Sequence, residues 1–266
     1  ISNIDISCKP LDWIVPTLSA YKVHKKIHTL KSNTNHYSMM KDIYDTWSKW
    51  TKDKPAVFIT YNGHKFDEEL YRRQFYWNLL NPFITNSGGN KRLDMLHMIR
   101  TISQVYPSLI DFEMNKNGYP VCKLESISQR IGVDTSSAHD ALSDCEFMLK
   151  IYQFIKENCP NILEEFLYQS SKKGFIKYLE EHLIFFFRYQ PFARYWNYPI
   201  SFIGLNPLNK NLAITIDLLY PQDDVFNMSY QEIIDCIQNP GSESPFKIFG
   251  INKTQSLVSY KNIEYS

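Results

Sequence analysis

The stretch Ala56-Val57-Phe58-Ile59-Thr60-Tyr61-Asn62-Gly63-His64-Lys65-Phe66-Asp67 decides the fold class. Its first five residues form a continuous apolar run, which is typical of a buried central strand. Asn62 and Gly63 indicate a turn, and we expect a helix from about Asp67 to Leu80. Asp67 then lies at the carboxyl end of a strand, a common place for a catalytic carboxylate in α/β sheets. The alternative is that Asp67 only caps the helix.

A second stretch, Ala138-His139-Asp140-Ala141-Leu142-Ser143-Asp144, opens a helix whose apolar residues follow the helical period as far as Ile155. Positions five apart lie about 140° apart around a helix, so His139 and Asp144 converge only if His139 is on the entering loop. In that arrangement Asp144 suits a metal ligand and His139 a proton acceptor. The alternative makes Asp140 an N-cap and leaves His139 and Asp144 as ordinary loop and surface residues.

The composition excludes several classes of protein. The chain has 266 residues, 44% of them hydrophobic, which argues against disorder and allows one large domain or two ordinary ones. The net charge of +1 gives no global attraction for nucleic acid, so a strand-binding groove would have to be locally basic. The five Cys are scattered without a CxxC, which argues against a zinc site or a disulfide framework and favours the reducing cytoplasm. No apolar run reaches membrane-spanning length.

The pattern along the chain changes at about residue 170. Before it we expect a half-buried strand at Ile4–Cys8 and several helices; after it we expect a linker-like stretch from Lys172 and a small β-rich region. The expected helices are marked by apolar residues over 37–50, 93–102, 124–131 and 163–167. The expected strands are 200–203, 212–217, 246–249 and 256–259, with a helix near 230–236.

The two motifs resemble the second and third motifs of the exonucleases that use four acidic residues and a His (DEDDh). Other stretches make almost the whole chain similar to the bacterial exodeoxyribonuclease I family, which degrades single-stranded DNA from its 3′ end. These stretches are Phe66-Asp67-Glu68-Glu69, Phe75-Tyr76-Trp77-Asn78, Pro82-Phe83, Arg92-Leu93-Asp94-Met95-Leu96, Lys123-Leu124-Glu125 and Asn209-Lys210-Asn211. Several motifs in the right order are more specific than either motif alone.

The resemblance implies an α/β fold in two parts. A ribonuclease H-like exonuclease domain, lacking its first strand, would occupy residues 1–160, and a linker with a smaller β-rich SH3-like domain would occupy residues 161–266. Asp67 and Asp144 would serve a site for two Mg²⁺ ions, or Mn²⁺, and His139 would be the general base. Contacts to the strand would come from five residues: Arg72, Phe83, Arg100, Lys123 and Asn211.

The resemblance also implies partners and a setting. We expect the protein to bind single-stranded DNA and single-strand-binding protein, to act in DNA repair or recombination, and to be a cytoplasmic monomer with no membrane contact. Arg and Lys side chains can neutralise phosphates, and Phe83 can stack on a base. Without the resemblance, each basic residue would be read as part of a solvated helix face.

The sequence departs from the family in two places. The opening motif of the family, an Asp-x-Glu on the first strand, is absent, and Asp111-Phe112-Glu113 lies in the wrong place to replace it. We therefore expect a chain truncated at both ends that binds Mg²⁺ poorly and is nearly inactive by itself. Lys123 stands where the family has Arg, so a phosphate contact there would lose the planar guanidinium fork.

Two other functions remain open at this point. The same chemistry could trim RNA, although the β-rich second part argues against it. The chain could instead be a non-catalytic single-strand-binding module that has lost its metal site. The presence of Asp67, His139 and Asp144 argues against a pure binder, because binding alone needs none of them.

Overall fold

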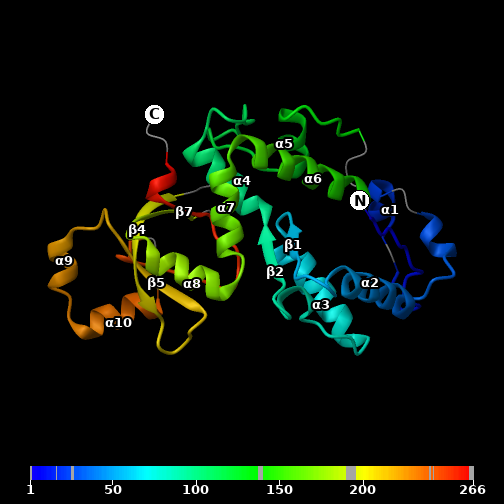
Figure 1. The fold of residues 1–266 in the computed structure, drawn as a ribbon, viewed down its shortest axis with the longest axis horizontal. Helices are drawn as coiled ribbons and strands as arrows, with labels where there is room; N and C mark the ends of the chain where they lie inside the picture. Colours follow the sequence, from blue (N-terminus) through cyan, green and yellow to red (C-terminus); the bar gives the residue numbers. More distant parts are fainter. Residues whose placement is uncertain are drawn as a thin grey trace.

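The computed structural model describes residues 2–15, 17–24, 27–136, 140–189, 196–239, 241 and 243–263. Figure 1 shows an elongated molecule with α9 and α10 at one end and α1 and α2 at the other. Its helices are α1 (Leu18–His24), α2 (His36–Trp50), α3 (Asp67–Trp77), α4 (Met95–Val105), α5 (Leu124–Arg130), α6 (Ala141–Asn158), α7 (Pro160–Gln169), α8 (Lys172–Glu181), α9 (Gln222–Phe226) and α10 (Tyr230–Gln238). Its strands are β1 (Val57–Thr60), β2 (Lys91–Asp94), β3 (Phe185–Tyr189), β4 (Trp196–Leu205), β5 (Leu212–Asp217), β6 (Phe246–Gly250) and β7 (Leu257–Ser259).

A short parallel sheet, β1 beside β2, forms the centre of the first part. Helix α4 follows β2 directly, and its side chains Met98, Ile99 and Ile102 are fully buried in one apolar cluster. Helices α6 and α7 complete this first core with Ile151, Ile155, Ile162 and Phe166, which recur at the spacing of one helix face. The small sheet therefore has a rigid helical support on the side of α4.

A five-stranded antiparallel sheet of order β6-β5-β4-β3-β7 forms the second part. Helix α8 packs Phe175, Tyr178 and Leu179 against its inner face, and Phe175 stacks on Phe249 with ring centroids 6.1 Å apart. This second core holds the sheet and α8 together through apolar burial. The strands expected over 200–203, 212–217, 246–249 and 256–259 are confirmed, as is the helix near 230–236.

The last strand joins the two parts. Successive side chains of a strand point to opposite faces, and in β7 Leu257 belongs to the second core while Val258 belongs to the first. The buried carboxylate of Glu165 on α7 accepts hydrogen bonds from Tyr178 Oη (2.8 Å) and from the Ser259 amide (3.1 Å). The two parts are thus connected by both apolar and polar contacts.

Four expectations about local structure were wrong. Ile4–Cys8 is not a strand: near this segment, Lys9 N–H donates to Thr34 O (3.0 Å) and Ser32 Oγ donates to Ser7 O (3.2 Å), so neither bond belongs to a sheet ladder. Strand β1 is only half-buried, because one neighbour, β2, pairs with it in the described sheet.

The other two wrong expectations concern where helices begin. Leu93 belongs to β2 and not to the following helix, which begins at Met95 after the side chain of Asp94 caps it. The segment from Lys172 is helix α8 and not a linker, since Ser171 Oγ accepts a hydrogen bond from the Gly174 amide (3.1 Å) as its N-cap. None of the described helices is long and apolar enough to cross a membrane.

Candidate functional site

A cavity of about 870 Å³, the carboxylate cavity, opens beside β1. Most of its lining is apolar and comes from α2, β1 and α3, but Asp67 and Asp144 both line it. Asp67 is the first residue of α3, and the N-cap position belongs to its predecessor Phe66, whose side chain makes no capping hydrogen bond. Asp67 is therefore not the N-cap of its own helix. Asp144 lies in the first turn of α6, where Asp140 is the N-cap, as the alternative interpretation of that residue proposed. Two carboxylates from distant stretches of sequence therefore share one cavity.

The turn that places Asp67 requires special backbone geometry. Asn62 has a φ of 61°, a left-handed conformation that Asn tolerates better than most residues. A Cβ on Gly63 would lie 2.4 Å from the side chain of Thr60, so only glycine fits there. The carboxylate of Asp94 accepts hydrogen bonds from the amides of Asn62 (2.7 Å) and His64 (3.4 Å), which fastens the turn to the end of β2.

The electrostatics of the carboxylate cavity favour proton retention. Burial raises the pKa of Asp67, and the negative charges of Asp94 and Glu68 raise it further, against the lowering effect of a backbone hydrogen bond. Burial also raises the pKa of the Cys145 thiol, followed by the charges of Asp144 and Asp67. Both carboxylates act on Cys145, which also lines the cavity, so both lie near its thiol. A divalent cation between them would offset their negative charge.

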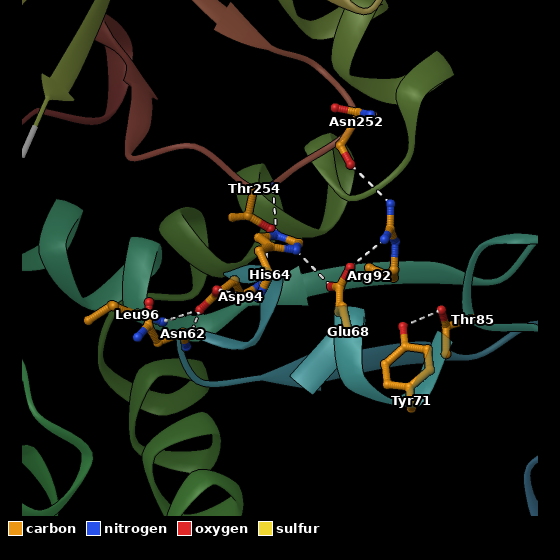
Figure 2. Close-up of polar contacts among 10 residues, drawn as sticks. All are labelled: Asn62, His64, Glu68, Tyr71, Thr85, Arg92, Asp94, Leu96, Asn252 and Thr254. Atoms are coloured by element: carbon orange, nitrogen blue, oxygen red, sulfur yellow. Dashed lines mark hydrogen bonds and ion pairs between the residues drawn. The ribbon is translucent and has the colours of Figure 1, made fainter. Parts of the chain in front are cut away.

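A buried polar network surrounds Glu68, the residue that follows Asp67 in the sequence (Figure 2). Glu68 contacts His64, with Oε1 2.7 Å from Nδ1, and forms an ion pair with the Arg92 guanidinium through Oε2. Nε2 of His64 accepts a hydrogen bond from the Thr254 amide (2.9 Å), and Arg92 donates to the Asn252 carbonyl (3.0 Å). Burial alone would raise the pKa of Glu68, but the contacts with His64 and Arg92 outweigh burial and lower it.

A second cavity of about 330 Å³, the basic cavity, lies between the two parts of the chain. It is lined by Arg72, Arg92, Lys172 and Lys253, with several Asn and Ser residues, and no Asp or Glu occurs among its described lining residues. Asn211 also lines it and accepts a hydrogen bond from Lys172 Nζ (2.7 Å). Arg92 is paired with Glu68, and the other three cations leave this cavity with an excess of positive charge, which favours anions.

The other predicted strand contacts are dispersed. Phe83 is 48% exposed, and the guanidinium of Arg72 lies 4.9 Å from its ring centroid, so these two residues form one surface. Arg100 is half-buried on α4, and burial lowers its pKa. Lys123 is exposed at the start of α5. Neither Arg100 nor Lys123 is among the described residues that line the two cavities. His139 lies outside the described residues.

The carboxylate cavity suits a hard divalent cation in donor type. Mg²⁺ is commonly bound by one or two carboxylates and completes its coordination with water and substrate phosphates. Asp67 and Asp144 supply such a pair. Among the described residues, no group of three or more His, Cys, Asp and Glu could hold a metal ion. The carboxylates of Asp111 and Glu113 have other partners: Asp111 forms an ion pair with Arg130, and Glu113 accepts a hydrogen bond from Ser126 Oγ.

Sequence reasoning assigned no role to His64, Glu68, Arg92 or Asp94. A signal was present, because Arg92 and Asp94 flank Leu93, the first apolar residue of an expected helix, and a charge that becomes buried needs a partner. Their partners Asn252 and Thr254 lie at the opposite end of the sequence, so spacing could not reveal them.

Comparison with known proteins gives a consistent result. An exodeoxyribonuclease I of Buchnera aphidicola subsp. Schizaphis graminum is 27% identical over 244 residues, which cover 86% of this chain and 50% of that protein. The exodeoxyribonuclease I of Escherichia coli strain K12 is 25% identical over 179 residues, which cover 64% of this chain and 37% of that protein. The chain is similar to exodeoxyribonuclease I. This confirms the predicted resemblance, although no protein-family profile matches the chain.

Solved structures of exonuclease I from E. coli share the fold. The structure in complex with a dA16 oligonucleotide has a TM-score of 0.78 at 20% identity, covering 99% of this chain and 59% of that one. A complex of exonuclease I with the SSB C-terminal peptide has a TM-score of 0.77 at 19% identity, covering 98% of this chain and 58% of that one. The α/β fold class is therefore confirmed. The chain spans about half the length of the exodeoxyribonuclease I relatives that it matches.

Proposed function

We propose that the chain carries part of the active site of a 3′-to-5′ exonuclease that degrades single-stranded DNA to mononucleotides. The observation that supports this most is that Asp67 and Asp144 line one cavity although they are far apart in sequence. The proposal includes a ribonuclease H-like exonuclease domain over 1–160, followed by a linker and an SH3-like domain over 161–266. Helix α7 follows this boundary, yet it packs Ile162 and Phe166 on the first core.

Each group has a separate task in the proposed reaction. Asp67 and Asp144 would hold Mg²⁺, or Mn²⁺, in a two-ion site, and the metal would stabilise the charge that develops on the attacking and leaving oxygens. His139, by the resemblance, would accept the proton of the attacking water. Because a carboxyl binds a cation in its deprotonated form, the raised pKa of Asp67 would make metal binding weaken at a higher pH than for an unshifted Asp.

The basic cavity would hold the DNA strand. Arg72 and Lys172 can neutralise phosphates, and Phe83, already in contact with Arg72, can stack on a base for about 1–3 kcal/mol. Arg100 and Lys123 would add strand contacts beyond the cavity, and Asn211 a polar contact within it. Single-strand-binding protein is a second proposed partner, because an exonuclease I structure is a complex with the SSB C-terminal peptide. We propose a cytoplasmic monomer acting in DNA repair.

We expect slow cleavage from this chain by itself. No Asp-x-Glu precedes Asp67 in the sequence, so two of the four carboxylates that the family uses are absent from the proposed site. Metal binding and strand binding therefore test the proposal better than turnover alone. Cleavage is best measured with the protein in excess over a 5′-labelled oligonucleotide.

The test compares Asp67→Asn and Asp144→Asn with the control Asp111→Asn, which removes an exposed carboxylate away from both cavities. Mn²⁺ binding is followed by electron paramagnetic resonance, and strand binding by fluorescence anisotropy with matched DNA, RNA and duplex probes. We expect both site variants to weaken Mn²⁺ binding while metal-free binding of single-stranded DNA persists, and Asp111→Asn to behave as wild type.

Three results would contradict the proposal in different ways. Unchanged Mn²⁺ binding in both site variants would favour the alternative of a non-catalytic single-strand binder. Tighter binding and faster cleavage of RNA than of DNA would favour the alternative of an RNA-trimming exonuclease. Products that shorten from the 5′ end would contradict the proposed direction.

A further inference from the structure

His64 occupies a position between the two cavities. Its side chain is 5% exposed, and its two ring nitrogens face different parts of the chain. Nε2 accepts the hydrogen of the Thr254 amide, so in the neutral ring Nδ1 carries the proton, and Nδ1 lies 2.7 Å from Oε1 of Glu68. The imidazole is rigid, and the separation of its two partners is therefore fixed by the ring.

Each partner of His64 belongs to a different cavity. Glu68 follows Asp67 directly in the first turn of α3, and both residues line the carboxylate cavity. Thr254 and Asn252 line the basic cavity. Arg92 makes a second connection in parallel, since it pairs with Glu68, donates to the Asn252 carbonyl and lines both cavities. Figure 2 shows both connections converging on Glu68.

A purely packing role would not require this arrangement. A buried imidazole needs polar partners, but neighbours within its own helix or strand would satisfy it. His64 instead bonds to a residue 190 positions away in the sequence. The segment it reaches is fastened to the first part again at the Asp94 amide, which donates to Thr254 Oγ1 (2.9 Å). The backbone that precedes Asp67 and the wall of the basic cavity are thus held as one unit.

We propose that His64 is a positioning residue that couples the two cavities, so that a strand seated in the basic cavity orders the Asp67 carboxylate for metal binding. This rests on the proposed function, because it assigns Asp67 to the metal site and the strand to the basic cavity. By reciprocity, a bound metal would strengthen strand binding by the same factor.

The test uses three variants of the chain. His64→Leu removes both polar contacts, and His64→Gln keeps one donor and one acceptor. His97→Leu is the control for loosening of that segment: Nδ1 of His97 lies 2.9 Å from Ser256 Oγ, and its ring lies beside that of His64, with centroids 6.4 Å apart, so the variant removes a bond to the segment while both polar contacts of His64 remain. Amide hydrogen exchange is measured over residues 66–70, and Mn²⁺ affinity is measured with and without a phosphorothioate dT oligonucleotide.

We expect the oligonucleotide to strengthen Mn²⁺ binding to the wild type by roughly fivefold or more, the lower end of couplings between sites. His64→Leu should abolish this strengthening and speed exchange over residues 66–70. His64→Gln should restore both properties, and His97→Leu should leave both unchanged.

The coupling is refuted if His64→Leu keeps wild-type exchange over residues 66–70, or if His97→Leu has the same effects as His64→Leu. The second result would mean general loosening of the 251–256 segment. Asp67→Asn separates the two proposals. If it binds Mn²⁺ as the wild type does, the assignment of the metal site is at fault, and the exchange measurement still decides whether His64 links the segments.

Discussion

Removal of the Arg92 guanidinium should destabilise the protein far more than removal of a surface charge. Arg92→Met keeps most of the side chain's apolar length and leaves the carboxylate of Glu68 without its cation. The side chains of Glu68 and Arg92 are 6% and 13% exposed, so water can replace the lost partner only in small part. Breaking one side of a buried ion pair typically costs about 3–5 kcal/mol. Because Nδ1 of His64 remains 2.7 Å from Glu68, we expect a value near the lower limit, about 3 kcal/mol.

This loss can be converted into a temperature shift. The unfolding entropy of a chain of 266 residues is about 0.6 kcal/mol/K near the midpoint, so a loss of about 3 kcal/mol lowers Tm by about 5 °C. The assays are urea unfolding followed by circular dichroism, and differential scanning calorimetry. Arg130→Met is the matched control, because its ion pair with Asp111 has side chains 41% and 89% exposed. We expect the control to cost about 0–1 kcal/mol.

A second substitution locates the origin of the cost. Adding Glu68→Gln to Arg92→Met removes the unpaired charge and keeps an oxygen that faces His64, so we expect the double variant to recover more than half of the lost stability. A cost below about 1 kcal/mol for Arg92→Met, the value for exposed pairs, would refute the reasoning. A double variant that is less stable than Arg92→Met alone would show that the cost is lost packing and not charge.

Three further predictions follow from the contacts described above. The lowered pKa of Glu68 stabilises the folded state above about pH 4.5, and this contribution is lost as the pH falls through the folded-state pKa. The difference in unfolding free energy between wild type and Glu68→Gln, measured by urea titration at several pH values, should therefore shrink below pH 4.5. Lys172→Ala should reduce the salt dependence of oligonucleotide binding, log Kd against log salt, by about 0.7 per lost phosphate contact. Lys177→Ala, on the same helix but not among the described lining residues of the basic cavity, should not. Glu165→Ala should lower the urea-derived unfolding free energy by at least about 3 kcal/mol, because several buried donors lose their acceptor at roughly 1–3 kcal/mol each; a cost below 1 kcal/mol would contradict it.

Local pattern was sufficient to predict most of the elements. The periodicity of Met98, Ile99 and Ile102 marks α4, and the alternating run 212–217 marks β5, because both follow from which faces are buried. The local pattern failed for elements whose formation depends on tertiary contacts. Strand β2 was not predicted, since Leu93 continues the apolar period of the next helix, and only pairing with β1 distinguishes the strand.

The candidate site was likewise predicted only in part. The two carboxylates were predicted as a pair, and the structure places Asp67 and Asp144 on one cavity. Their support was not predicted, because Glu68, Arg92 and His64 obtain partners from residues 252 and 254, which no spacing rule connects. Of the residues that line the basic cavity, only Arg72 and Asn211 were predicted as strand contacts. Lys172 and Lys253 were not predicted, because the packing of the second part brings them to the cavity.

The contribution of β7 to both cores has a consequence for synthesis on the ribosome. Val258 completes the first core, yet most of the residues around it, such as Met98 and Ile151, leave the exit tunnel much earlier. Domains generally fold as units during translation, and here the first core stays incomplete until Val258 is available. Nascent chains arrested before residue 257 should therefore be degraded readily by added protease and bound by chaperones, and chains arrested well beyond it should not.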